Sequence, residues 1–144
     1  MRQFCALVGL GLFVAGTLAQ GNFAEGFDNN GTVLPGADGP QNLINQGWIF
    51  RNQSQPLGSS TWFTGYNDWF PPQAGVGYLA VDSSSTDYFG GDISQWAILP
   101  AVPGQQAGDT VTFYVRRFDS SNVDTLQLRY SPSGGTSTDR KSVV

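Results

Sequence analysis

The alternation of apolar and polar positions in the second half of the chain predicts β-strands. Residues 109–117 and residues 125–130 each place an apolar side chain at every second position. A period of two with one apolar face is typical of antiparallel strands that cover a core. The polar residues 118–124 between the two strands predict a turn, and hence a β-hairpin. The positions expected to point inward are Val111, Phe113, Val115, Leu126, Leu128 and Tyr130.

Shorter apolar segments upstream predict further strands, separated by loops rich in Gly, Asn, Ser and Pro. These segments are residues 23–28, 48–52, 77–81 and 95–99, and residues 62–64 form a further short apolar piece. The nearly continuous apolar character of residues 77–81 predicts a strand that is buried on both faces. Several short strands divided by turn residues are typical of an all-β domain such as a jelly-roll β-sandwich. No segment has the apolar spacing of a long helix.

Residues 1–19 have the pattern of an export signal. Arg2 provides a positive start, an apolar stretch runs to Val14, and Thr17 and Ala19 occupy the two positions that a signal peptidase reads. We therefore expect cleavage after Ala19. The apolar stretch is too short to cross a bilayer as a helix, although a retained N-terminal anchor remains the alternative.

Removal of this signal would also remove Cys5, which is the only cysteine, and the chain contains no histidine. The mature chain then lacks the residues of a disulfide, of a Ser-His-Asp triad and of the usual zinc sites. Eleven acidic and seven basic residues give a net charge of −4. This charge argues against nucleic acid as a partner, since such binding needs a basic surface, and its ordinary consequence is solubility.

Residues 139–144 read Asp-Arg-Lys-Ser-Val-Val, which is also the translation of a string that resembles a common sequencing-adapter read. We therefore expect authentic sequence to end at about Thr138, with a natural polar terminus as the alternative. Residues 131–138 read as a loop, after which another strand would follow. On this view residues 20–138 are one domain that is incomplete at its C-terminal end, and any surface anchor would lie outside this chain.

Several stretches along the mature chain share the order and spacing of a known family. They are Glu25-Gly26-Phe27-Asp28, Gly47-Trp48 with Asn52-Gln53-Ser54 and Trp62-Phe63, Tyr78-Leu79-Ala80, the stretch 94–100, the stretch 108–114 and the stretch 124–131. Together they resemble the bacterial choice-of-anchor J domains, which are relatives of the cleaved adhesin domain. The chain departs from the family at Leu99, where the family more often has a polar residue before the proline.

This resemblance implies a jelly-roll β-sandwich, export and attachment to the cell surface, in many Gram-negative members through a PEP-CTERM sorting tail. No such tail is visible in this sequence. The resemblance also raises the expectation of structural calcium. Calcium takes six to eight oxygen ligands, and the loop carboxylates of Glu25, Asp28 and Asp82 are the candidate ligands, with Asp87 and Asp92 as further acids. The alternative is that these acids are simply solvated.

The aromatic stretch of residues 62–70 is the strongest candidate for a binding site. Rings of Tyr66 and Trp69 can stack on sugar faces, while Asn67 and Asp68 can bond sugar hydroxyls. The alternative is that these rings close the core, which is the interpretation we adopt for the preceding pair at residues 62–63. For Tyr66 and Trp69 both interpretations stay open.

No catalytic residue is predicted. Glu25 is the only glutamate, and nothing in the sequence places a second acid beside it for glycoside hydrolysis. The sequence thus predicts a secreted or cell-surface adhesion domain that binds a glycan or a protein surface and meets a membrane only through an anchor outside this chain. The alternatives are a carbohydrate-binding module of a larger extracellular enzyme and a structural matrix protein.

Overall fold

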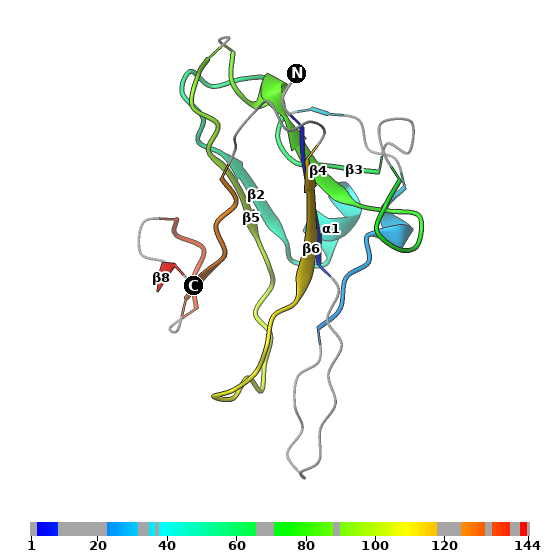
Figure 1. Cartoon of the computed structure of the whole chain (residues 1–144). Coiled ribbons are helices and arrows are strands. Elements are labelled where there is room, and N and C mark those ends of the chain that lie inside the picture. The colour runs from blue at the N-terminus through cyan, green and yellow to red at the C-terminus, as the bar shows by residue number, and fades with distance from the viewer. Residues whose placement is uncertain are drawn as a thin grey trace.

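The described part of the chain is an all-β structure with one short α-helix (Figure 1). The computed structural model describes residues 3–8, 23–31, 35–36, 38–65, 71–87, 90–117, 125–131, 134–138 and 142–143, with the backbone alone for 3–8 and 142–143. The strands are β1 (Gln3–Val8), β2 (Ile49–Asn52), β3 (Phe63–Thr64), β4 (Leu79–Asp82), β5 (Gln95–Ile98), β6 (Phe113–Arg117), β7 (Arg129–Tyr130) and β8 (Ser142–Val143). The helical elements are α1 (Gln41–Asn45) and the 3-10 turns η1 (Asp28–Asn30) and η2 (Ser83–Ser85).

The strands form one four-stranded sheet and two pairs, and every pairing is antiparallel. The large sheet has the order β3-β4-β1-β6, while β2 pairs with β5 and β7 pairs with β8. β1 pairs with β4 from Gln3↔Asp82 to Ala6↔Leu79, and with β6 from Phe4↔Arg117 to Val8↔Phe113. β1 is therefore the strand that joins β6 to the rest of this sheet.

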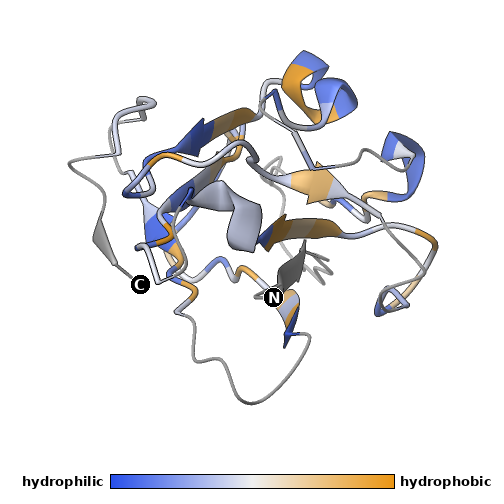
Figure 2. Cartoon of the chain, turned by 90° about the horizontal axis from the view of Figure 1, so that it is seen from above, coloured by the Kyte–Doolittle hydropathy of each residue, from blue (hydrophilic) through white to orange (hydrophobic). Residues whose placement is uncertain are grey.

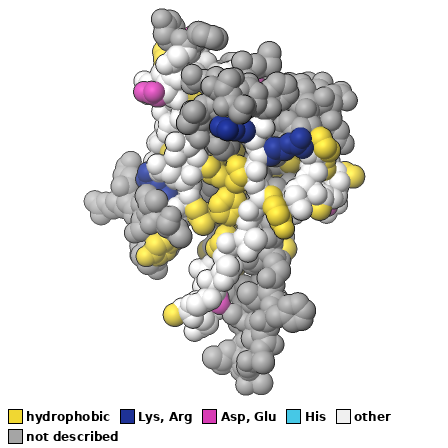
Figure 3. All heavy atoms as spheres, in the orientation of Figure 1, with side chains coloured by type: hydrophobic (Ala, Val, Ile, Leu, Met, Phe, Trp, Pro, Cys, Tyr) yellow, Lys and Arg dark blue, Asp and Glu magenta, His cyan; other side chains and the backbone are white. Residues whose placement is uncertain are grey.

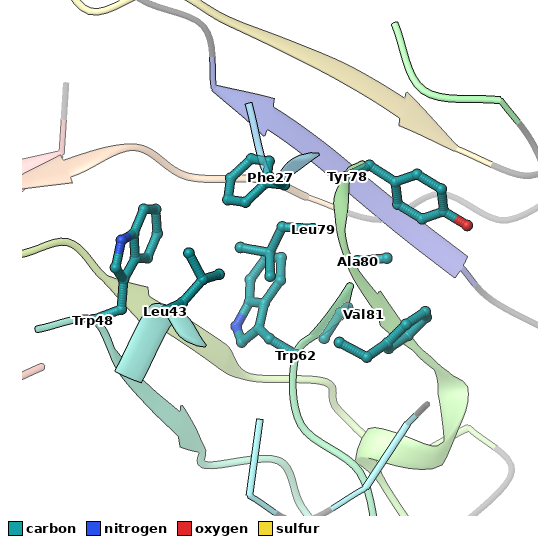
Figure 4. Packing of buried hydrophobic residues seen from close by; sticks show 9 residues of the cluster. Phe27, Leu43, Trp48, Trp62, Tyr78, Leu79, Ala80 and Val81 are labelled. Atoms are coloured by element: carbon teal, nitrogen blue, oxygen red, sulfur yellow. The ribbon is translucent and has the colours of Figure 1, made fainter. Parts of the chain in front are cut away.

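The hydrophobic core lies between the large sheet and the β2–β5 pair, and α1 contributes Leu43 to it (Figure 4). Trp48 is its aromatic centre, because its ring packs within about 6 Å of three other rings: the centroid distances are 6.1 Å to Phe23, 5.9 Å to Phe27 and 6.1 Å to Phe50. Full burial of one such side chain contributes about 1.5–3 kcal/mol. Seen from above, both layers carry hydrophobic residues in their strands (Figure 2).

A network of polar side chains joins the large sheet to the β2–β5 pair. The Asn52 amide nitrogen donates to the carbonyl oxygens of Ser60 and Ser85 at 2.8 and 2.7 Å. The Gln95 amide nitrogen donates to the same Ser60 carbonyl at 3.0 Å, and its oxygen accepts from the Thr61 hydroxyl at 2.9 Å. These side chains satisfy the Ser60 carbonyl, whereas the Ser85 carbonyl also accepts the Gly58 N–H at 3.0 Å.

The predicted strands at residues 48–52, 77–81 and 95–99 are confirmed as β2, β4 and β5. All four residues of β4 are buried, as the continuous apolar run predicted. The predicted strand at residues 23–28 is wrong. Phe27 has a φ of +63°, in the left-handed region, and this ends the extended chain just before η1.

The predicted hairpin between residues 109–117 and 125–130 is also wrong. In the structure β6 pairs with β1, and β7 pairs with β8. Three of the positions expected to point inward are open to solvent, and two of them, Val111 and Val115, are 52% and 47% exposed. Tyr130 is 54% exposed. In the structure β6 takes β1 as its partner, and residues 129–130 take β8 instead of β6.

Candidate functional site

The two ends of the aromatic segment, residues 66–70, are fixed to the large sheet. The Gly65 N–H donates to the Tyr78 carbonyl oxygen at 2.9 Å. At the other end, a guanidinium nitrogen of Arg116, on β6, donates to the Pro71 carbonyl oxygen at 3.3 Å. Gly65 has a φ of +48°, a conformation that suits glycine and turns the chain away from β3. The segment therefore leaves beside β4 and returns beside β6.

The four predicted binding residues lie outside the described residues: Tyr66, Asn67, Asp68 and Trp69. The structure thus places only the two ends of their segment, Gly65 and Pro71. The rings of Trp62 and Phe63, which precede the segment, are buried in the core, and this confirms the interpretation adopted for them.

A tight turn at residues 27–31, which we call the Asp28 turn, lies beside the base of the aromatic segment. Asp28 Oδ1 accepts hydrogen bonds from the backbone N–H groups of Val76 and Gly77, at 2.6 and 3.0 Å. The Thr64 hydroxyl donates to the Gly31 carbonyl oxygen at 3.0 Å. These bonds tie the Asp28 turn to the end of β3 and to the chain that leads into β4.

The Asp28 turn carries backbone strain. Phe27 adopts its positive φ although it has a bulky side chain, a conformation that costs about 1–3 kcal/mol. Glu25 Oε1 accepts the Phe27 N–H at 2.6 Å, and the Phe27 ring is 1% exposed, so a hydrogen bond and core burial both hold this conformation. Strained residues that the surroundings hold in place are concentrated at binding and catalytic sites.

Asn30, within the Asp28 turn, is 5% exposed, and neither its amide oxygen nor its amide nitrogen has a hydrogen-bond partner in the described structure. A buried polar group without a partner costs about 1–3 kcal/mol, and most native proteins avoid it. The sequence analysis missed this residue, because an Asn-Asn-Gly stretch reads as an ordinary turn. Only its burial distinguishes it.

Asp82 lies at the opposite end of β4 from the Asp28 turn. Its Oδ1 accepts the Ser60 hydroxyl at 2.8 Å and the Ser84 N–H at 3.0 Å, and the residue is 6% exposed. The five residue-to-residue steps from Gly77 to Asp82 span about 16 Å as extended chain. An ion with ligands at about 2.3–2.6 Å cannot bridge Asp28 and Asp82.

The structure therefore does not bring Asp82 together with Glu25 and Asp28, and each of these carboxylates already accepts a hydrogen bond from within the chain. In the described ranges, no group of three or more His, Cys, Asp or Glu side chains is placed to hold a metal ion. Calcium at one end of β4, with ligands beyond these, stays a prediction.

A second feature missed from the sequence is the pair formed by Trp96 on β5 and Arg129 on β7. The guanidinium carbon of Arg129 lies 5.1 Å from the centroid of the Trp96 ring, which is the geometry of a cation–π interaction. The two residues are 33 positions apart, and no local pattern links them. The contact holds the C-terminal part of the described chain against β5.

Comparison with known proteins found no matching family model, no matching curated protein and no matching solved structure. None of the described helices has the length and apolar character needed to cross a membrane.

Proposed function

We propose that this chain is a secreted, non-catalytic binding domain of the jelly-roll type, which presents Tyr66, Asn67, Asp68 and Trp69 to a glycan or a protein surface. The observation that carries the proposal is the attachment of both ends of their segment to the large sheet, through Gly65 and Arg116. A binding segment whose ends are fixed to a rigid sheet loses less conformational entropy when a ligand binds.

The chemistry of the segment favours a glycan. Tyr66 and Trp69 combine flat apolar rings with polar edges, which suit the apolar faces and the hydroxyl groups of a sugar. Asn67 and Asp68 add hydrogen-bond groups between the rings.

The resemblance to cell-surface adhesin domains supports export and a binding role in preference to turnover. A carbohydrate-binding module of a larger enzyme would use the same residues and differ only in the protein to which it is joined. A structural matrix protein would differ in having no specific ligand. The structural matrix protein is favoured by the apolar side chains that are exposed on β6, at Tyr114 and Val115.

The test is binding of the exported chain to a glycan array, followed by titration of the best ligand against Trp69→Ala. We expect about fivefold weaker binding, because a stacked ring contributes on the order of 1 kcal/mol and about 1.4 kcal/mol is tenfold in affinity. The control is Leu57→Ala, which removes a large apolar side chain that is 62% exposed and lies outside the proposed site.

Two results would contradict the proposal. An equal loss of binding in both variants would show that the aromatic segment is not the site. Absence of any ligand, together with concentration-dependent association of the unmodified chain, would favour the structural matrix protein.

A further inference from the structure

β1 is the strand on which the large sheet depends. It pairs with β4 at four register positions and with β6 at five, and β6 has no other partner among the described strands. Because β1 is antiparallel to both neighbours, β4 and β6 run parallel to each other, two strand spacings or about 9–10 Å apart. Their facing edges present backbone groups that β1 satisfies.

The same six residues, Gln3–Val8, lie inside the predicted export signal. Cleavage after Ala19 removes β1 from the mature chain. The backbone groups of β4 that face β1 then lose their partners, although all four residues of β4 are buried. A buried strand edge without partners is strongly disfavoured, so another strand is required in this position.

We propose that the space between β4 and β6 is a strand-acceptor slot, filled by β1 in the precursor and by residues 125–130 in the exported chain. This inference rests on the export that we propose above. Residues 125–130 are as long as β1, with six residues each. They follow β6 after the seven residues 118–124, a connection that is longer than a typical hairpin loop of about two to five residues and long enough to return the chain alongside β6.

The direction of residues 125–130 fits the slot. A strand that returns from β6 through a hairpin is antiparallel to β6, and in the slot it is antiparallel to β4 as well, as β1 is. The strand order β4–(125–130)–β6 then reproduces the order and both directions of the precursor sheet. When residues 125–130 fill the slot, β4 has no open edge. A strand of this length also accounts for the alternation of apolar and polar residues over 125–130, of which β7 contains only two.

The side chains also fit. Leu79 on β4 and Val115 on β6 share one face of the sheet, because both pair with Ala6. A register with Leu128 opposite Val115 places Leu126 and Leu128 on that face, since strand side chains alternate. Leu126 already packs against the core, so a short movement is enough to keep it buried.

In the precursor, apolar side chains on β6 are exposed, as expected for a strand whose face is only partly covered by its neighbours. Tyr114 and Val115 are 50% and 47% exposed. On the face drawn in Figure 3, hydrophobic side chains gather near the middle of the molecule, with basic side chains beside them. Two leucines on the core face of the slot would cover part of the surface around Val115, which the precursor leaves open.

The test compares two natural forms of the chain: the exported product, and the full chain made by cell-free synthesis without a signal peptidase. Intact mass identifies each form, and amide hydrogen exchange is then followed by mass spectrometry. We expect residues 125–128 to exchange at least about tenfold more slowly in the exported chain, because sheet amides open far less often than loop amides. β4 and β6 should stay protected in both forms, with β2 and β5 as the reference.

A variant tests the same point independently. Gln127→Pro removes an N–H that a central strand needs, whereas Gln127→Ala keeps it and removes only the side chain that bonds Arg129. We expect the proline to lower the melting temperature of the exported chain and to leave that of the full chain unchanged, while the alanine leaves both within a degree or two of the unmodified chain.

Several outcomes would overturn the inference. They are an exported product that retains residues 3–8, unchanged exchange at residues 125–128 with β4 unprotected, and equal effects of Gln127→Pro on both forms. Protection of β4 only at concentrations where sedimentation shows dimers would assign the slot to a second copy. Glycan binding is measured on the same samples, so that ligand binding without slow exchange refutes the slot alone, and slow exchange without a ligand refutes the binding function alone.

Discussion

Replacement of Asp82 by alanine tests how much the hydrogen bonds at the end of β4 stabilise the fold. Asp82 Oδ1 accepts from the Ser60 hydroxyl, whose residue is 2% exposed, and from the Ser84 N–H at the start of η2. Alanine removes both acceptor interactions at once. The Ser60 hydroxyl then stays buried without its acceptor. Water could replace this acceptor only by entering the core.

The expected loss follows from these two bonds. A buried hydrogen bond to a charged acceptor contributes about 1.5–3 kcal/mol, and loss of a helix-capping side chain costs about 1 kcal/mol. We therefore expect Asp82→Ala to lower the free energy of unfolding by about 3 kcal/mol. At about 4 °C per kcal/mol for a chain of this size, the melting temperature falls by about 12 °C. Asp82→Asn keeps an acceptor oxygen and should cost about 1 kcal/mol.

Urea denaturation followed by circular dichroism measures these differences, and Asp87→Ala is the control because it removes the same charge from an exposed position. Ser60→Ala should cost much less in the Asp82→Ala background than in the unmodified chain, since the two residues share one bond. Equal losses for the alanine and asparagine variants would refute the hydrogen-bond explanation. If millimolar calcium raises the melting temperature of the unmodified chain and neither Asp82 variant responds, then Asp82 is a metal ligand.

Two further predictions concern the Asp28 turn. Gly77→Ala should lower the free energy of unfolding by about 1–3 kcal/mol in the same denaturation assay, because a methyl group there would overlap the Phe27 carbonyl oxygen; an unchanged midpoint would mean that the turn lies farther from β4. Asn30→Leu should leave stability unchanged or raise it by about 1 kcal/mol, because it removes two unpartnered buried polar atoms. A large loss of stability in Asn30→Leu would instead assign the amide a structural partner.

The strands nearest the core could be predicted because local pattern and tertiary environment agree there. Residues 77–81 read as a continuous apolar run, and the structure buries the resulting strand on both faces. Residues 48–52 and 95–99 became the β2–β5 pair, with Phe50 and Ala97 in the core layer. In each case burial of the apolar side chains requires the same extended conformation that the sequence pattern favours.

The Asp28 turn could not be predicted in the same way. Residues 23–28 alternate well enough for a strand, but Asp28 bonds two N–H groups that lie 48 and 49 positions away, and Phe27 gives up its extended conformation to bury its ring. Long-range contacts of this kind override a short local pattern. Only the aromatic segment of the candidate site could therefore be predicted from the sequence. The Asp28 turn at its base, with Asn30, was found only in the structure.

The failed hairpin prediction has a different physical origin, which also bears on the strand slot. Alternation reveals which segments are extended and which face is apolar, but strands pair through backbone groups that every residue carries. The sheet edge of β6 can therefore accept Gln3–Val8 or residues 125–130, and their side chains decide only the register. Which of the two segments pairs with β6 depends on which segment is present and on the length of the loop that must close to bring it beside β6. Residues 125–130 close a short loop, which favours them entropically, whereas β1 would be available only until the proposed cleavage after Ala19. In the strand-slot proposal, the sequence pattern and the structure describe two pairings of one sheet edge, one before and one after that cleavage.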